Sequence, residues 1–308
     1  MNTYDVKSID EFVLPQALKN KVVTIIKSAK KRETLPDHML LYGLPGTGKT
    51  TLARLIAKEF NVALITFEGA MLNSADKLTQ LVNIIEPGAV LFIDEIHSSN
   101  SKVLEILYNI MEDNFLWLNE TTKFLLAPLC VIGATTQIQD IPKPLYTRFI
   151  YKIPFPVYKE EELTQIIKQM VKAFKLSITD NATKIISKIS KGTPRMARTH
   201  IQLLKDYAVI KDIPEITETD VQSYAKEYKI DLNLGLSATD IAILKSIGEY
   251  NTISARTLAI KNNLTEEEYL KNYEIFLIQE GYIDITRTGR MLTDKGKEVA
   301  YGQRNGNI

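Results

Sequence analysis

A glycine-rich stretch ends in a lysine and two threonines. The segment LLYGLPGTGKTTLARLIAK includes the spacing G-x-x-x-x-G-K-T and contains, in order, Gly43, Gly46, Gly48, Lys49, Thr50 and Thr51. Because glycine turns tightly and leaves its backbone N–H open, such a loop surrounds an anion with donors. The spacing predicts a polyphosphate site in which Lys49 contacts the β- and γ-phosphates and the Thr50 hydroxyl binds Mg²⁺.

The residues on either side of this loop support that interpretation. His38 to Tyr42 is strand-like, and Thr51 to Phe60 has apolar residues at helical spacing. A helix that begins beside the loop adds unpaired N–H groups and the positive end of its dipole. The alternative is a glycine turn that matches by chance, which the flanking strand and helix make the weaker interpretation.

Two adjacent carboxylates end a second apolar run, AVLFIDEIH, from Ala89 to His97. The run predicts a buried strand of a parallel sheet, and ligands bind at the C-terminal ends of such strands. We expect Asp94 to hold Mg²⁺ through its water shell and Glu95 to polarise the water that attacks the γ-phosphate. The alternative is a strand that simply ends in solvated acids. We interpret His97 as an ordinary loop or helix-cap residue.

Two further positions are candidates for contact with the γ-phosphate. A strand-like run from Leu129 to Ala134 ends in Thr135 and Thr136, whose hydroxyls either bond a phosphate or water or cap the next turn. Arg148, in PLYTRFIYKIPF, is either a surface ion-pair residue or a finger offered to the nucleotide of a neighbouring subunit. A finger would neutralise charge that develops in the transition state.

The middle of the chain changes to a helical pattern. Helices are expected over Glu161 to Leu176, Asn181 to Ser190 and Pro194 to Ile210. Pro194 suits a first helical turn and places Arg195 at the helix start. A cation there opposes the helix dipole, so Arg195 either contacts a nucleotide phosphate or is solvated.

The last segment predicts a winged helix-turn-helix. Helical stretches over Thr239 to Tyr250, Ser254 to Asn262 and Glu266 to Glu280 precede two short alternating runs in YIDITRTGRMLTDKG. Ser237 and Thr265 resemble N-caps, the latter forming a capping box with Glu268. Three helices with a small hairpin are common in proteins that bind nucleic acid.

Charge limits how this segment contacts DNA. Residues 231–308 contain nine Lys and Arg and eleven Asp and Glu, a net charge of −2. We therefore expect local DNA contact through Arg287 and Arg290 in the wing and no broad basic face. The alternative is a winged helix used for protein contacts.

Composition excludes several other classes of protein. The chain has 308 residues, 45% of them hydrophobic, and a net charge of +1. No apolar run approaches the roughly eighteen residues of a membrane helix, and the acidic N-terminus does not resemble a signal peptide. Cys130 is the only cysteine and there are three histidines, so neither a disulfide nor a zinc site is expected. These features favour the cytoplasm.

The order of the motifs resembles the RuvB family of AAA+ motors. From about Ile9 to Thr293 the chain contains LLYGLPGTGKTTLARLIA, VLFIDEIH, LYNIMED, VIGATT, LYTRF, KGTPRMA and FLIQEGYIDITRTGR. The resemblance implies an α/β fold with a parallel sheet in an AAA+ P-loop ATPase domain at residues 1–155. An all-α lid at 156–230 and a C-terminal winged-helix DNA-binding domain at 231–308 would follow. It also implies a homohexamer that uses ATP to drive branch migration of Holliday junctions, as a helicase in recombination and repair.

The resemblance assigns roles by position. Lys49, Thr50 and Thr51 match the phosphate loop, and Asp94 and Glu95 match the metal and water residues. The remaining matches are Thr136 as the first sensor, Arg148 as the finger in trans, Arg195 as the second sensor, Tyr158 as a nucleotide contact and Arg290 as a DNA contact. The implied cofactors are ATP and Mg²⁺.

The chain departs from the family pattern at several places. Tyr4, Asp5 and Val6 stand where the family has a Leu-Arg-Pro stretch, and Tyr146 and Ile285 each replace an arginine. Arg287 partly stands in for the arginine replaced by Ile285. The segment between Met111 and Ile132 is shorter than the family hairpin that docks on the junction-binding partner RuvA.

This short hairpin still contains apolar residues. Phe115, Trp117 and Phe124 flank an expected turn at Asn119 to Thr122. They are either packed back on the core or offered to a partner, and a RuvA-like protein would bind over Phe115 to Leu126.

We interpret the chain as a divergent ATP-driven DNA motor. One alternative is an AAA+ initiator or loader that uses ATP as a switch on duplex DNA. The other is a weakly hydrolysing nucleotide-dependent assembly protein, suggested by Asp5 and Tyr146 and opposed by the intact Glu95 and Arg148.

Overall fold

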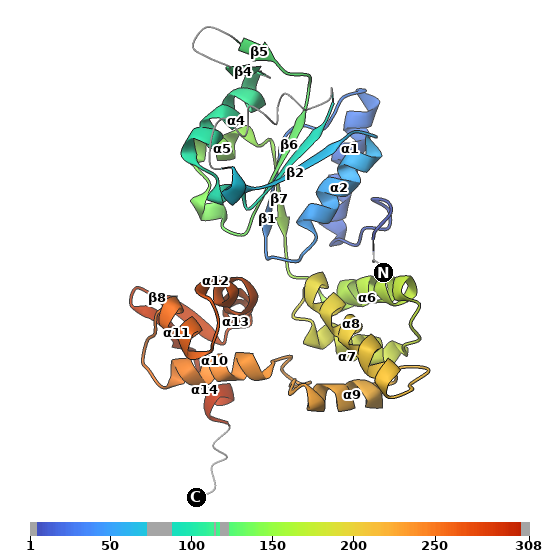
Figure 1. The fold of residues 1–308 in the computed structure, drawn as a ribbon, viewed down its shortest axis with the longest axis vertical. Helices are drawn as coiled ribbons and strands as arrows, with labels where there is room; N and C mark the ends of the chain where they lie inside the picture. Colours follow the sequence, from blue (N-terminus) through green and yellow to red (C-terminus); the bar gives the residue numbers. More distant parts are fainter. Residues whose placement is uncertain (1–4, 73–87, 114, 118–122, 303–308) are drawn as a thin grey trace, which may run out of the picture. The chain divides into compact units, whose positions relative to one another are not determined.

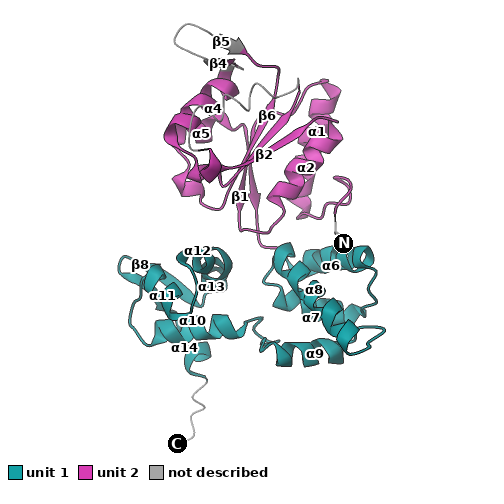
Figure 2. Ribbon diagram, viewed as in Figure 1, with its two compact units in different colours: residues 1–2, 159–308 teal, residues 3–158 magenta. Residues whose placement is uncertain are grey.

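The computed structural model describes residues 5–72, 88–113, 115–117 and 123–302 (Figure 1). The chain forms two compact units, and the boundary between them falls between Tyr158 and Lys159 (Figure 2). In chain order, the first unit is the α/β structure at residues 3–158, which is magenta and labelled unit 2 in Figure 2. The second unit is the mainly helical structure from Lys159 onward, which is teal and labelled unit 1 there. Both classes of structure agree with the expectation from the sequence.

A five-stranded parallel sheet forms the centre of the first unit, in the order β2-β3-β6-β1-β7. Its strands are β1 (Met39–Gly43), β2 (Leu64–Glu68), β3 (Val90–Asp94), β6 (Cys130–Thr135) and β7 (Tyr151–Phe155). The strands expected at His38 to Tyr42 and at Leu129 to Ala134 are present and shifted by one residue. The run that begins at Ala89 forms β3, and β2 was not predicted. Strand β6 lies between β1 and β3, so the C-terminal ends of these three strands are neighbours.

Helices cover both faces of this sheet (Figure 1). On one face lie α1 (Gln16–Lys31) and α2 (Lys49–Glu59), and on the other α4 (Ser101–Asp113) and α5 (Lys143–Arg148), with short 3-10 turns at η1 (Gly69–Met71), η2 (Ile96–Ser98) and η3 (Ile138–Asp140). Apolar residues of β3 and β6 pack with those of α4 and α5 in one buried cluster that includes Leu91, Val131, Leu107 and Phe149. The sheet is thus buried on both faces, which explains why its central strands are apolar runs.

A short antiparallel hairpin follows α4. It pairs β4 (Phe115–Trp117) with β5 (Lys123–Leu125), and Phe115 lies opposite Leu125. Leu125 is 76% exposed, so this apolar residue is not packed on the core. The side chains of Trp117 and Phe124 and the expected turn at Asn119 to Thr122 lie outside the described residues.

The second unit begins with four helices, α6 (Glu160–Phe174), α7 (Asp180–Ile189), α8 (Pro194–Ile210) and α9 (Glu218–Glu227). The bounds of α8 match the prediction, because Pro194 and the Thr193 N-cap both mark its start. Helix α9 was not predicted. Helices α6 and α7 begin within two residues of the expected positions.

The winged-helix part follows in the same unit. Its elements are α10 (Ala238–Gly248), α11 (Ala255–Lys261), α12 (Glu266–Tyr269), η4 (Leu270–Glu274), α13 (Ile275–Gln279), β8 (Ile283–Thr286), β9 (Gly289–Leu292) and α14 (Asp294–Tyr301). Ser237 and Thr265 cap helices as predicted, each within a capping box. The helix expected over Glu266 to Glu280 is interrupted by η4, which is a π-helical turn. Helix α14 packs against α10 and was not predicted.

None of the helices in the described part of the chain is long and apolar enough to cross a membrane. The single cysteine, Cys130, is buried at the start of β6, and its burial raises the pKa of the thiol.

Candidate active site

The phosphate loop between β1 and α2 depends on left-handed backbone. Gly43, Gly46 and Gly48 have φ angles of 140°, 78° and 107°, which L side chains rarely adopt. A Cβ on Gly43 would lie 2.1 Å from the Phe155 carbonyl oxygen, and one on Gly48 would lie 3.1 Å from the Phe12 ring. The glycines therefore allow close packing of the loop as well as exposure of its N–H groups.

Lys49 begins α2 and points into the loop, with its side chain buried. Its Nζ donates hydrogen bonds of 2.8 Å to the carbonyl oxygens of Gly43 and Leu44. The Thr47 hydroxyl donates to the Leu44 carbonyl as well, at 2.8 Å. The loop thus holds the ammonium group where phosphate charge would be bound, and the exposed Thr50 follows directly.

Tyr158, at the end of the first unit, ties the loop to the N-terminal segment. Its hydroxyl lies 2.9 Å from the Thr47 carbonyl oxygen and 3.2 Å from that of Val13. The side chain is buried. Tyr158 therefore supports the phosphate loop through the Thr47 carbonyl. The family match implied a nucleotide contact for Tyr158 and did not predict this support of the loop.

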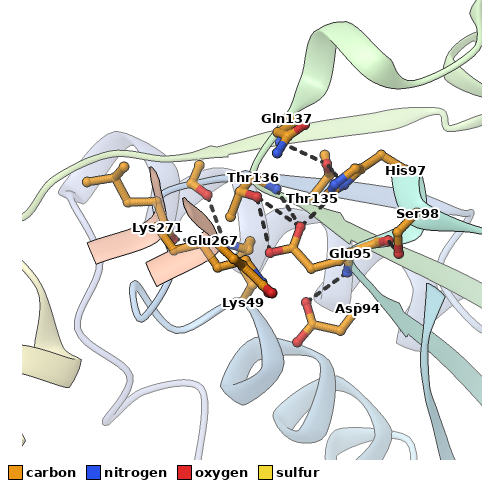
Figure 3. Close-up of polar contacts among 12 residues, drawn as sticks. Lys49, Asp94, Glu95, His97, Ser98, Thr135, Thr136, Gln137, Glu267 and Lys271 are labelled. Carbon is orange, nitrogen blue, oxygen red and sulfur yellow. Dashed lines mark hydrogen bonds and ion pairs between the residues drawn. The ribbon is translucent and has the colours of Figure 1, made fainter. Parts of the chain in front are cut away.

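Asp94 ends β3 as a half-buried carboxylate (Figure 3). Burial raises its pKa, the charge of Glu95 raises it further, and Lys49 opposes the shift. A carboxylate in this environment is stabilised in its charged form by a cation. The Asp94 carboxylate and the Thr50 hydroxyl are hard oxygen donors, the type that Mg²⁺ prefers, so the side chains fit a Mg²⁺-nucleotide.

Glu95 has a strained backbone. Its φ of 47° is left-handed, which is uncommon for a residue other than glycine and occurs often at functional sites. Gly69 allows this turn to pack, because a Cβ there would lie 2.3 Å from the Glu95 carbonyl oxygen. The tight turn directs the carboxylate toward the end of the neighbouring strand β6.

Thr136 holds that carboxylate (Figure 3). Its backbone N–H donates to Glu95 Oε2 at 3.0 Å, and its hydroxyl lies 3.1 Å from Oε1 and 3.0 Å from Oε2. The prediction left open whether the strand-end hydroxyls contact the phosphate site or cap a turn. The structure places Thr136 on the proposed base and Thr135 in a local turn, where Thr135 Oγ1 accepts a hydrogen bond from the Gln137 N–H.

His97 is also part of this group, although the sequence reading treated it as an ordinary loop residue. Its Nδ1 lies 2.9 Å from Thr135 Oγ1 and 3.3 Å from Glu95 Oε2 (Figure 3). Through these two contacts His97 helps to position the Glu95 carboxylate. No local sequence pattern predicts this role, because the contact with Thr135 depends on β6 lying beside β3.

Arg148, the predicted finger, is held against α4 of its own unit. Its Nη2 lies 2.5 Å from Glu112 Oε2, and its guanidinium carbon lies 4.9 Å from the centre of the Tyr108 ring. Nη1 donates to the Pro144 carbonyl at 3.0 Å, whereas the buried Nε has no hydrogen-bond partner among the described residues. The structure thus shows Arg148 in an ion pair, and its role as a finger stays a prediction.

Arg195 lies in the second unit, as the second residue of α8. The side chain is exposed, as a residue that meets a phosphate must be. Thr193 caps the helix and accepts a hydrogen bond from Met196, so the first turn is defined without any help from Arg195. The Arg195 cation thus lies at the positive end of the α8 dipole, which disfavours a positive charge.

The comparisons with known proteins agree with one another along the chain. Residues 5–154 match the Holliday junction DNA helicase RuvB P-loop domain, residues 158–231 the RuvB AAA lid domain and residues 233–300 the RuvB C-terminal winged helix domain. The chain belongs to the RuvB family.

Individual RuvB proteins are similar over nearly their full length. The Holliday junction branch migration complex subunit RuvB of Streptococcus agalactiae is 36% identical over 96% of this chain and 91% of its own. That of Phytoplasma mali is also 36% identical, over 93% of this chain and 89% of its own. The structure of the Thermotoga maritima RuvB Holliday junction branch migration motor is 32% identical with a TM-score of 0.87, covering 96% and 97% of the two chains.

The departures from the RuvB pattern have local structural partners. Asp5 Oδ1 pairs with Arg54 Nη1 at 2.7 Å, and the ring of Tyr146 lies 4.9 Å from Lys152 Nζ. Ile285 is 55% exposed on β8. Tyr4 lies outside the described residues, and Val6 is partly buried. The contacts of Asp5 and Tyr146 thus involve none of Lys49, Asp94 and Glu95.

The two wing arginines expected to contact DNA have different environments. Arg287 is exposed in the turn between β8 and β9. Arg290 instead binds Glu274, with Nε at 2.6 Å from Oε2 and Nη2 at 3.0 Å from Oε1. Arg287 is therefore the better-exposed candidate for DNA contact, and the contact of Arg290 with DNA stays a prediction.

Proposed function

We propose that this chain is an ATP-driven motor that moves duplex DNA and drives branch migration of Holliday junctions in recombination and repair. The observation that carries the proposal is the meeting of three groups at the ends of adjacent strands. The Lys49 loop follows β1, Asp94 ends β3 with Glu95 directly after it, and Thr136 follows β6. Membership of the RuvB family supports the DNA substrate.

Each group has a role in phosphoryl transfer to water. Lys49 and the loop N–H groups bind the β- and γ-phosphates, and Glu95 accepts a proton from the attacking water. Thr136 holds the Glu95 carboxylate through two donors, so its hydroxyl is placed to exchange that contact for the γ-phosphate. Thr51, Tyr158 and Arg195 are proposed as further contacts of the nucleotide.

Thr50 and Asp94 would hold Mg²⁺, which neutralises charge on the phosphates during hydrolysis. Among the described residues, no group of three or more His, Cys, Asp or Glu side chains is arranged to hold a metal. Protein groups would therefore supply only part of the coordination, with phosphate oxygens and waters completing it.

Arg148 would complete the site of a neighbouring subunit in a homohexamer. Its buried Nε has no acceptor among the residues that the structure describes, and its partner Glu112 is exposed. Both features support a side chain that can leave its resting contact. In the neighbour's site its charge would stabilise the transition state. The three-domain division at residues 1–155, 156–230 and 231–308 and a cytoplasmic location belong to the same proposal.

DNA would be contacted by the wing, through Arg287 and Arg290. A RuvA-like junction-binding protein would bind the hairpin over Phe115 to Leu126, where the exposed Leu125 supports an apolar contact. The shortened hairpin would offer a smaller surface than its family counterpart.

ATP turnover by the purified chain tests the proposal. We would measure it alone, with linear duplex and with a synthetic four-way junction, at low salt because phosphate contacts weaken as salt rises. A motor is stimulated by DNA and moves the junction arms. If the chain binds ATP but its slow turnover is not changed by either DNA, the motor proposal is contradicted. That result would favour an ATP switch or an assembly protein.

The variant Glu95→Gln tests the hydrolysis step separately from ATP binding. It should bind ATP and lose turnover by about 10²- to 10⁴-fold, because the amide cannot accept the proton. Turnover near that of the unmodified chain would refute the assignment of Glu95.

A further inference from the structure

A lysine ammonium is buried between the four-helix part and the winged-helix part of the second unit. The Lys191 side chain is 6% exposed, and its Nζ lies 2.5 Å from Oδ2 of Asp240, which is fully buried in α10. The same Nζ lies 4.9 Å from the centre of the Phe276 ring and 5.5 Å from that of Tyr273. Lys191 thus inserts into the winged-helix part and touches α10, η4 and α13.

Asp240 also organises the start of α10. Its Oδ2 accepts hydrogen bonds from the Ser237 N–H at 2.7 Å and from the Ser237 hydroxyl. Its Oδ1 has no hydrogen-bond partner among the described residues. Within the described part of the chain, the Lys191 ammonium is the one cation paired with this buried carboxylate. Loss of the lysine would leave the carboxylate charge uncompensated.

The backbone connects Lys191 directly to Arg195. Lys191 and Gly192 have φ angles of 51° and 61°, and Thr193 then caps α8, in which Arg195 is the second residue. Thr193 N–H donates to the Ser190 carbonyl at 3.0 Å, and the side chain of Ser190 is fully buried. This short left-handed turn is fixed at both ends, so a displacement at the start of α8 is passed to Lys191.

A second contact prevents the winged-helix part from turning freely on its linker. Gly235, with φ of 68°, lies against the end of α7, where an added Cβ would be 3.0 Å from the Lys188 carbonyl oxygen. The linker also closes on itself through a hydrogen bond from the Asp231 N–H to the Leu236 carbonyl. One attachment would permit rotation, whereas the linker and Lys191 together define one orientation.

We propose that Lys191 is a positioning residue that couples nucleotide contact at Arg195 to the orientation of the winged-helix part. The proposal rests on the function proposed above, since it takes Arg195 as a nucleotide contact. An apolar pair could hold the two parts together as tightly. A buried ion pair also resists displacement, because any movement that separates Lys191 from Asp240 leaves two buried charges unpaired. The contact therefore favours one arrangement over a range of intermediate ones.

Hydrogen exchange on the full chain tests the coupling without DNA. We would compare Mg²⁺-ADP with Mg²⁺-ATPγS and follow residues 43–51, α10 and the β8 to β9 hairpin. In the unmodified chain, we expect the exchange of all three segments to differ between the nucleotides. In Lys191→Met/Asp240→Asn, which leaves no unpaired buried charge, we expect only residues 43–51 to respond.

Three variants control this comparison. Lys188→Met removes an exposed lysine three residues earlier and should behave as the unmodified chain. Lys191→Arg keeps the cation and should retain the response of α10. Lys191→Gln/Asp240→Asn keeps a hydrogen-bonding pair without either charge, and it replaces the Met/Asn double variant if that protein does not fold.

The outcomes separate this proposal from the function. The coupling is overturned if the hydrogen exchange of α10 still differs between the nucleotides in the folded double variant. It is also overturned if, in the unmodified chain, residues 43–51 differ between the nucleotides and α10 does not. Duplex affinity should change by about tenfold between the two nucleotides in the unmodified chain, within the usual range of coupling, and remain constant in the double variant. If the nucleotide changes the hydrogen exchange of α10 but DNA never stimulates ATP turnover, the motor proposal fails and the coupling stands.

Discussion

Arg148 in the first unit and Arg290 in the second each lie against a glutamate, yet the two ion pairs are built differently. The side chains of Arg148 and Glu112 are 28% and 59% exposed, whereas those of Arg290 and Glu274 are 18% and 7% exposed. A pair with an exposed acid contributes little stability, while a buried acid that loses its partner is strongly destabilising. The same two residue types therefore form a releasable contact in one unit and a structural one in the other.

The donors of the two guanidinium groups show the same contrast. Arg290 uses Nε and Nη2 together on Glu274, and these hydrogen bonds raise its pKa. Arg148 contacts Glu112 through Nη2, and its Nε has no acceptor in the described ranges of the chain. A bidentate pair fixes the orientation of the guanidinium group as well as the distance, whereas a single-donor pair fixes the distance alone.

Removal of the releasable arginine should give the largest effect. Arg148→Ala is expected to lower the turnover number by about 10³-fold or more, because the transition-state charge in the neighbouring site is no longer neutralised. The free energy of unfolding should change by less than about 1 kcal/mol, since an exposed pair adds little. Steady-state ATP turnover and denaturant unfolding measure the two effects.

Mixed subunits distinguish a finger in trans from a local role. Arg148→Ala subunits mixed with Lys49→Ala subunits should recover part of the activity, because some interfaces then combine an intact Lys49 with an intact Arg148. If the mixture stays inactive while each variant still assembles, the shared site is excluded.

Loss of the structural arginine should affect stability first. Arg290→Met leaves Glu274 buried and unpaired, at an expected cost of about 3–5 kcal/mol in the local opening of the wing. Hydrogen exchange of β8 and β9 measures this cost without assuming that both units unfold together. The double variant Arg290→Met/Glu274→Leu should recover most of it, and equal or greater loss in the double variant would refute the structural role.

The smallest expected effect is that of the exposed wing arginine. Arg287→Ala should reduce the slope of log affinity against log salt for duplex DNA by about 1, as expected for one lost phosphate contact. Stability should change by no more than about 0.5 kcal/mol, because the side chain is exposed. Fluorescence anisotropy at several salt concentrations gives the slope, with Lys297→Ala on α14 as a control that should leave it unchanged.

Local signals explain what the sequence could predict. The phosphate loop, the strand ending at Asp94 and the start of α8 depend on spacing, apolar runs and caps within a few residues. Most of the active-site assignments follow from these signals together with the order of motifs along the chain.

The contacts that were missed join distant residues. His97 meets Thr135 only because β6 pairs with β3, and Arg148 meets Glu112 only because α5 packs on α4. Lys191 and Asp240 are 49 residues apart and lie in different parts of the second unit. Such pairs depend on tertiary packing, which residue periodicity does not encode.

The π-helical turn η4 has a consequence for how the wing could change in evolution. The turn places one extra residue between α12 and α13, and Glu274 is its last residue. Because a π turn takes up one extra residue within about the same angular advance as an α-helical turn, deletion of one residue from Leu270 to Tyr273 would let a regular α-helix form while α12 and α13 keep their faces. Glu274 would still face Arg290. The turn η4 is therefore a place where this helix can lose one residue, whereas a deletion in the regular turns of α10 would rotate the residues after it by about 100°.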